Sequence, residues 1–273
     1  MTISKRIEIP MFPGGKRLAF TTSWDDGTIH DRQMVALLNS FGIKGTYNLN
    51  SGIFGPSSGW HHRIEASEVA SLFAGNEVAV HTVTHPWLQL LDPSQIAYEV
   101  LDDRKALEDL VGYPVRGMAY PFGTSNARVV EVLRALGIVY CRSTQSGETT
   151  WPPAEPLVWG TTAHFLAPDL PERFKAWYEN PRSKGLYYVW GHSYECEERK
   201  DWDAVTRVFK PMSGKNDIWY CTNIELFDYE AARNRLVIAA NRGSAHNPSG
   251  TPVTVSCDGK LVEIPGGKTI RLA

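Results

Sequence analysis

Cysteines are few, long apolar runs are missing, and neither sign of charge is in excess. The 4 cysteines form no Cys-x-x-Cys pair, so they indicate buried thiols and neither a disulfide framework nor a zinc knuckle. A net charge of −2 offers no basic field for nucleic acid and no polybasic patch for membranes. No apolar run reaches the roughly 18 residues that a transmembrane helix needs. We therefore expect neither nucleic acid nor membrane as a partner.

An apolar segment followed by a small-residue cleavage site is also missing near the N-terminus. The sequence thus predicts a cytoplasmic protein, while a secreted form whose signal had been removed would look the same. No pattern in the sequence indicates the oligomeric state.

The sequence does contain enough apolar material for a large core. Hydrophobic residues make up 42% of its 273 residues and aromatic residues 11%. This length allows one large domain with a small appendage.

Short β-rich runs alternate with helical patterns over residues 1–225. The expected strands lie at 16–24, 45–50, 77–83, 117–120, 138–142, 157–161, 186–190 and 218–221. The expected helices lie at 34–41, 67–73, 93–111, 127–136 and 170–178. This alternation predicts an α/β fold whose parallel sheet closes into a distorted (β/α) barrel of about seven strands. Residues 226–273 instead predict a helix at 227–235 and a small β appendage of antiparallel strands.

The first candidate site follows the first expected strand, in the run SWDDG. In a β/α barrel the chemistry lies at the C-terminal ends of the strands, which is where Asp25 and Asp26 stand. Two adjacent carboxylates repel each other, and a metal ion is one partner that would hold them together. The alternative is a solvated turn in which an aspartate caps the next helix.

The second candidate site is the run HTVTHP, with His81 and His85 four residues apart. In an extended strand the two imidazoles would lie roughly 13 Å apart, so a shared metal requires the chain to curl after Val83. Pro86 favours such a departure from regular structure. Two histidines and one aspartate leave positions open for water and substrate, as in a catalytic metal site, and the second aspartate can serve as a base. The alternative is two separately hydrogen-bonded histidines.

Two further runs lie at strand ends. In VWGHSYE, His192 is placed to act as a general acid, although a histidine hydrogen-bonded only for structure would look the same. In RGMAYPFG, the turn can expose a backbone N–H to an oxyanion, and Arg116 could pair with a carboxylate.

Taken in order, SWDDG, HTVTH, RGMAYPFG and VWGHSYE resemble the motifs of the polysaccharide deacetylase family (NodB homology, carbohydrate esterase family 4). The resemblance covers roughly residues 18–195. It implies a metal-dependent hydrolase that removes acetyl groups from N-acetylated, sometimes O-acetylated, sugars, so that an acetylated carbohydrate is the expected partner. It also implies one divalent metal ion, with zinc as the first choice and cobalt, nickel or manganese as alternatives.

The resemblance also assigns roles to single residues. It implies that Asp25 is the catalytic base, that Arg116 holds this base, and that His192 protonates the leaving group. The implied metal ligands are Asp26, His81 and His85. The implied oxyanion- and substrate-binding residues are Tyr120, Pro121, Phe122 and Trp190.

The chain departs from the family pattern at one point that concerns the implied general acid, His192. An Asp-x-x-Asp-Trp motif often follows the third motif, but residues 141–147 lack it, so the sequence identifies no residue that tunes His192. Aromatic side chains that could contact a sugar, or that could simply belong to the core, stand at Trp60, Trp87, Trp151, Trp159 and Trp190. Two other functions remain open: a hydrolase of another C–N bond, in a small amide or cyclic imide, and a catalytically silent sugar-binding module.

Overall fold

The computed structural model describes residues 5–56 and 61–272, and Trp60 lies outside them. The helices are α1 (Asp31–Ser40), α2 (Val69–Leu72), α3 (Pro93–Val111), α4 (Ala127–Ala135), α5 (Leu170–Glu179), α6 (Tyr194–Glu198), α7 (Asp203–Phe209) and α8 (Asn223–Asn234). The strands of the central sheet are β2 (Leu18–Asp25), β3 (Gly45–Leu49), β4 (Glu77–Val80), β5 (Gly117–Ala119), β6 (Tyr140–Ser146), β7 (Trp159–Thr161), β8 (Ala163–His164), β9 (Gly185–Gly191) and β10 (Ile218–Tyr220). The remaining strands are β1 (Ile7–Glu8), β11 (Val237–Ile238), β12 (Ser244–His246), β13 (Val253–Cys257), β14 (Lys260–Ile264) and β15 (Thr269–Arg271).

The central sheet is parallel and closes on itself. Its strand order is β7-β6-β5-β4-β3-β2-β9-β8, and β10 pairs with β2 off this path. The two end strands, β7 and β8, are separated only by Thr162, and β7 pairs with β6 while β8 pairs with β9. One extended run therefore joins both edges of the sheet. The predicted distorted barrel is confirmed.

The alternation of side chains along β2 brings polar groups into the barrel. Leu18 and Phe20 belong to the large core cluster that the surrounding helices share, whereas Ala19 belongs to a second cluster with side chains of β6, β7 and β9. Because successive side chains of a strand point to opposite faces, Asp25 lies on the same face as Ala19. The last residue of β2 thus faces the interior of the barrel, where it is buried.

The N-terminal end of the barrel is closed by the start of α8. The backbone N–H of Ile224 donates to Glu77 Oε2 at 2.8 Å, and the N–H of Asn223 donates to Thr46 Oγ1 at 3.0 Å. Tyr140 donates to the other oxygen of Glu77, at 2.6 Å. The buried carboxyl of Glu77 has its hydrogen bonds satisfied, as a buried polar group requires. The start of α8 therefore covers this end of the barrel.

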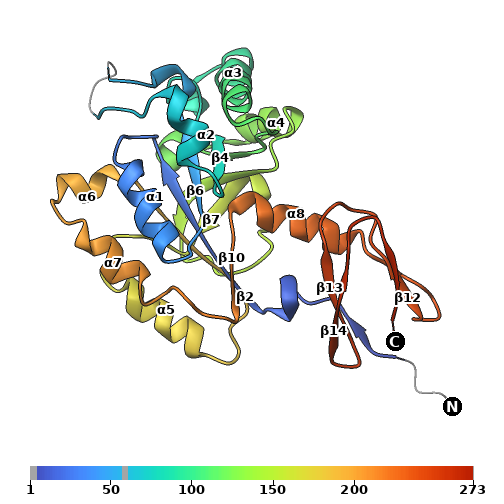
Figure 1. Ribbon diagram of the computed structural model, residues 1–273. Coiled ribbons are helices and arrows are strands. Elements are labelled where there is room, and N and C mark those ends of the chain that lie inside the picture. Colours follow the sequence, from blue (N-terminus) through green and yellow to red (C-terminus); the bar gives the residue numbers. More distant parts are fainter. Residues whose placement is uncertain (1–4, 57–60, 273) are drawn as a thin grey trace.

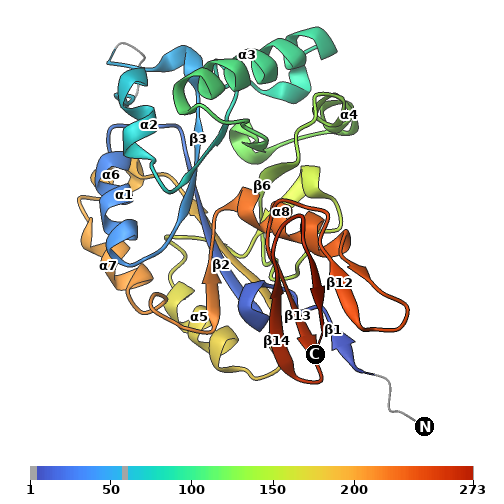
Figure 2. The ribbon, with the colours of Figure 1, turned by 45° about the vertical axis from the view of Figure 1, so that its right-hand side comes forward.

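The C-terminal appendage packs beside the barrel, with α8 between the two (Figure 1). It consists of the antiparallel sheets β1-β13-β14 and β11-β12-β15, which enclose a small apolar core of their own. The N-terminal strand β1 pairs with β13, so both described chain ends lie in this appendage (Figure 2). Within the described residues, no helix is long and apolar enough to cross a membrane.

Most expected elements appear within a few residues of their predicted bounds, with three differences. The expected strand 77–83 ends at Val80, because the chain turns at the first histidine of HTVTH. The expected helix 227–235 begins earlier, at Asn223, where Thr222 caps it. The short helices α6 and α7 were not predicted, since each is too brief to show a clear periodicity.

Candidate metal centre and active site

Side chains from three motifs meet at the C-terminal end of the barrel. Asp25 ends β2, His81 directly follows β4, and His192 directly follows β9. They border a cavity of about 620 Å³. The side chains in its lining are those of Asp25, Asp26, Ile53, Arg63, His81, Thr84, His85, Tyr120, Phe122, Thr144, Trp190, His192 and Tyr194.

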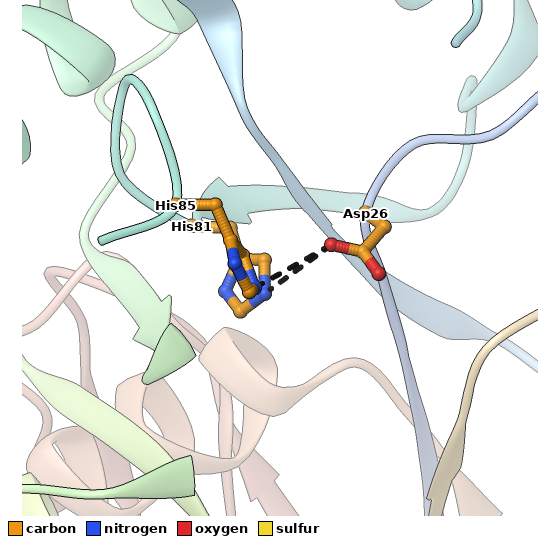
Figure 3. A group of neighbouring side chains, drawn as sticks. All are labelled: Asp26, His81 and His85. Carbon is orange, nitrogen blue, oxygen red and sulfur yellow. Dashed lines mark ion pairs between the residues drawn. The ribbon is translucent and has the colours of Figure 1, made fainter. Parts of the chain in front are cut away.

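The expected metal ligands converge. Asp26 Oδ1 lies 3.8 Å from His81 Nε2 and 3.6 Å from His85 Nε2, and both imidazoles point toward the carboxylate (Figure 3). Ligand atoms on a tetrahedral zinc ion are about 3.3 Å apart, so little movement would be needed to bind one. Asp26 Oδ1 is buried and has no hydrogen-bond partner among the described residues. Donor set, spacing and this unpartnered oxygen all fit a divalent metal ion.

The curl between the two histidines is held by carboxylates of α3. Thr82 and His85 have positive φ angles of 72° and 61°, which are strained for residues with side chains. Glu99 accepts hydrogen bonds from the N–H and the hydroxyl of Thr84, at 2.9 and 2.6 Å. Asp103, one turn further along α3, accepts from the N–H of His81 at 3.0 Å. A helix that packs outside the barrel therefore sets the geometry of the metal ligands.

The orientation of His81 leaves one ring nitrogen for the metal. Its Nδ1 lies 2.8 Å from the carbonyl oxygen of Ala119, which favours the tautomer with the proton on Nδ1. Burial lowers the pKa of His81 to about 4, despite the nearby aspartates. The imidazole is therefore neutral at pH 7, and the lone pair of Nε2 faces Asp26.

The arginine that holds Asp25 is Arg142 rather than Arg116. Both Asp25 oxygens accept from Nη2 of Arg142, and Asn48 donates to Oδ1 at 2.8 Å. Burial alone would raise the pKa of Asp25, but the nearby Arg142, His81 and His192 together outweigh burial and hold this pKa well below its usual range. Asp25 is thus ionised and fixed at neutral pH.

Arg116 forms a different ion pair, so the expectation that it orients the base is corrected. Its guanidinium binds both oxygens of Asp228 on α8, at 2.8 and 2.6 Å. The physical reason is its position before β5, at the N-terminal end of the barrel. The sequence does contain an indication that Arg142 points into the barrel. It lies two residues after Tyr140 in β6, so the two side chains are on the same, interior face of the strand.

The partner of His192 is Glu195, which the sequence did not identify. His192 Nε2 lies 3.9 Å from oxygens of both Asp25 and Asp26, and its Nδ1 lies 3.6 Å from Glu195 Oε2. The same oxygen is 3.1 Å from His164 Nε2. Burial lowers the pKa of His192, but these carboxylates outweigh burial and raise it overall.

His164, His192 and Glu195 also place ligand-type atoms within 4.8 Å of one another. Since Glu195 already lies between the two imidazoles, the group is explained as a support for His192 without a second metal ion. The signal for Glu195 is its place three residues after His192, at the start of α6, where one helical turn brings the two together.

The third motif forms part of the wall of the cavity. Tyr120 and Phe122 line the cavity, whereas Pro121 is buried in the turn and the Tyr120 hydroxyl donates to the carbonyl of Leu157 at 2.7 Å. Phe122 has a positive φ of 58°, and its ring stacks on Trp87 with centroids 4.0 Å apart. Trp190 also lines the cavity, and the guanidinium carbon of Arg142 lies 4.7 Å from the centre of its ring.

Arg63 is a cavity residue that no sequence pattern indicated. Its Nη2 lies 3.9 Å from Asp26 Oδ1, and its side chain is 13% exposed. It stands outside all four motifs, so only the folded chain brings it to the site.

Comparison with known proteins bears on this site directly. A family model for polysaccharide deacetylases matches residues 14–141, a range that contains Asp25 and all three expected metal ligands. Residues 14–141 therefore resemble the polysaccharide deacetylase family. The resemblance drawn from the four motifs is thereby confirmed. A search of curated proteins found no match.

Solved structures of polysaccharide deacetylases share the fold. A Mycobacterium smegmatis protein, provisionally described as a polysaccharide deacetylase, aligns with 14% identity over 82% of this chain and 93% of its own, with a TM-score of 0.58. The Xyl-CE4 domain of a multidomain xylanase from the hindgut metagenome of Trinervitermes trinervoides aligns with 15% identity over 80% and 92%, with a TM-score of 0.52. The alignment with the Streptococcus pyogenes deacetylase PplD, at 21% identity and a TM-score of 0.43, spans 47% of this chain and 57% of that one. At these identities the likeness concerns the fold alone.

Proposed function

We propose that this protein is a metal-dependent hydrolase that removes the acetyl group from the nitrogen of an N-acetylated sugar. One observation carries the proposal: an Asp-His-His trio and a separate ionised carboxylate, Asp25, border the same cavity. Three ligands leave a divalent ion open to substrate, and the additional carboxylate lies beside them to take a proton.

The metal ion would be held by Asp26, His81 and His85. When bound, a divalent ion, zinc as the first choice, would supply electrophilic activation of the acetyl carbonyl and of the attacking water. The family that residues 14–141 resemble supports hydrolysis of an acetyl group, and the trio supports its dependence on a metal ion.

The protein's own residues would move the protons. Asp25, kept ionised by Arg142, takes a proton from the attacking water as its oxygen bonds to the acetyl carbon. The backbone N–H of Phe122 is proposed to stabilise the developing oxyanion. His192, whose pKa the neighbouring carboxylates raise, donates a proton to the nitrogen as the C–N bond breaks. Acetate and a free amine are the products.

An exposed aromatic surface supports a sugar as the substrate. Phe122 lines the cavity, and Trp87 stacks on it in parallel; the two are 44% and 43% exposed. A flat aromatic surface of this kind suits the apolar face of a pyranose ring. Trp151 and Trp159 do not contribute, because both are buried in the core.

The test combines metal binding with acetate release. Metal-stripped protein is titrated with zinc, and the zinc-loaded protein is assayed with N-acetylglucosamine oligosaccharides. We expect one zinc ion per chain, loss of this binding in His81→Ala, and acetate release that Asp25→Asn abolishes while it still binds zinc. The matched control is Asp228→Asn, which removes a carboxylate at the other end of the barrel.

The other outcomes separate the alternatives. Absence of a specific zinc site would overturn the metal-dependent mechanism. Zinc binding with cleavage of small amides or cyclic imides, and no acetate release from any sugar, would favour the other C–N hydrolase. Sugar binding without any turnover would favour a silent binding module.

A further inference from the structure

The guanidinium of Arg63 lies beside the metal trio, and two of its nitrogens have no hydrogen-bond partner in the part of the chain that the structure describes. Its Nε and Nη1 atoms are buried and unpartnered among the described residues, and its Nη2 reaches no closer than 3.9 Å to Asp26 Oδ1. An arginine cannot lose its proton in this setting, and buried donors without partners cost free energy. Two donors of Arg63 without partners, next to a long ion pair with Asp26, require an explanation.

The backbone fixes Arg63 against the first motif. The N–H of Arg63 donates to Gly55 at 3.4 Å, and an isolated β-bridge joins it to Thr28. The next residue, Ile64, donates to the carbonyl of Gly27 at 2.9 Å. The side chain therefore projects into the cavity from a backbone that both neighbouring segments hold in place.

The carboxylates of the site have other partners. Asp25 is paired with Arg142, and Glu195 lies between two imidazoles. The remaining carboxylate, Asp26, is the proposed ligand of a divalent cation, and that cation would add positive charge next to Arg63. Asp31, a further buried carboxylate that Arg63 attracts, already accepts a hydrogen bond from Ser193. Among the described residues, no carboxylate is at hydrogen-bond distance from the guanidinium of Arg63.

From this arrangement we propose that Arg63 binds an anionic group of the substrate, a carboxylate close to the acetylated nitrogen. The planar guanidinium offers two parallel N–H donors, which match the two oxygens of a carboxylate. The substrate class is then an acidic N-acetylated sugar. This inference rests on the proposed deacetylase function, since it names the kind of sugar that the same cavity accepts.

The first experiment compares matched sugars with the unaltered protein. N-acetylmuramic acid and N-acetylglucosaminuronic acid each differ from N-acetylglucosamine mainly by a carboxylate, at two different positions of the ring. Binding is measured by calorimetric titration of zinc-loaded protein with the deacetylated form of each sugar, which is not turned over, and kcat/KM for acetate release is measured with the acetylated sugars. We expect at least one acidic sugar to bind roughly tenfold or more tightly than the neutral sugar, as a charge-assisted hydrogen bond predicts.

Variants then assign this preference to one side chain. Arg63→Gln should bind the acidic and the neutral sugar equally, while Arg63→Lys should keep part of the preference because it keeps the charge. The matched control is Arg134→Gln, which removes an arginine from an exposed ion pair with Glu155 on the surface and should leave the preference unchanged.

The outcomes distinguish this inference from the proposed function. If the unaltered protein binds neither acidic sugar more tightly than the neutral one, the inference is overturned, whether or not acetate is released. If it prefers an acidic sugar and Arg63→Gln removes the preference, the inference stands. The same preference without acetate release from any sugar would support the anion site and contradict the deacetylase function. A preference that survives in Arg63→Gln would overturn the role of Arg63.

Discussion

Replacing Arg142 by methionine would test whether the site depends on a buried ion pair. The side chains of Arg142 and Asp25 are 1% and 4% exposed, so neither charge has access to bulk water. Removing one partner of such a pair leaves the other charge buried, at a cost of about 3–5 kcal/mol. Because Asn48 still donates to Asp25, we expect the lower value, a decrease of about 3 kcal/mol in the free energy of unfolding.

The double variant makes this expectation specific. Asp25→Asn alone leaves the guanidinium of Arg142 buried and unpaired, and is expected to be destabilising too. Asp25→Asn with Arg142→Met leaves no charge, so it should be less destabilised than the sum of the single variants by about 2–3 kcal/mol.

Urea unfolding of the metal-stripped proteins at pH 7 measures these differences. The matched control is Arg116→Met, whose ion pair with Asp228 is about one-third exposed on both sides and should contribute about 1 kcal/mol or less. Additive effects of Asp25→Asn and Arg142→Met, within about 0.5 kcal/mol, would refute the view that the two charges are coupled.

Three further predictions concern other parts of the molecule. Burial raises the pKa of Glu77 to about 7, so the folded protein keeps a proton that the unfolded chain loses above about pH 4.3, and the free energy of unfolding falls as the pH rises between these values. In urea unfolding, Glu77→Gln should therefore gain about 2–3 kcal/mol relative to the wild type between pH 5 and pH 8. Parallel pH profiles of the two proteins would contradict this. Glu99→Ala should weaken zinc binding roughly 10–100-fold by releasing Thr84, while Asp109→Ala on the exposed side of the same helix should not; equal affinities in titration would speak against the role of α3. Trp87→Ala should raise KM for an oligosaccharide roughly fivefold with kcat little changed, as the loss of one stacking contact predicts, and an unchanged KM would remove the argument for a sugar platform.

The barrel and the metal trio could be predicted because both follow from local patterns. The alternation of apolar strands with amphipathic helices determines the sheet, and a parallel sheet brings all C-terminal strand ends to one edge. Asp26, His81 and His85 each stand at or just beyond such an end, so their meeting required no knowledge of side-chain packing.

The supporting residues could not be predicted in the same way. Arg116 stands just before β5 and Arg142 lies within β6, and only the barrel's register places Arg142 at the active end and Arg116 at the closed end. Glu99 and Asp103 are acidic residues on a helix, where the ordinary expectation is a solvated face, yet both are buried against the histidine loop. These contacts are long-range, and a single sequence does not reveal which long-range contacts form.

The closure of the barrel by α8 has a consequence for the order in which the chain can fold. During synthesis the strands of the barrel emerge first. The N–H of Ile224, which donates a hydrogen bond to the buried Glu77, is made only later, and β1 has no strand to pair with until β13 has been made. In an unfinished chain, α8 therefore does not yet cover the N-terminal end of the barrel, and β1 is not yet paired. The last fifth of the sequence therefore completes two structures: its own small sheets, and the N-terminal end of the barrel, whose strands are synthesised earlier.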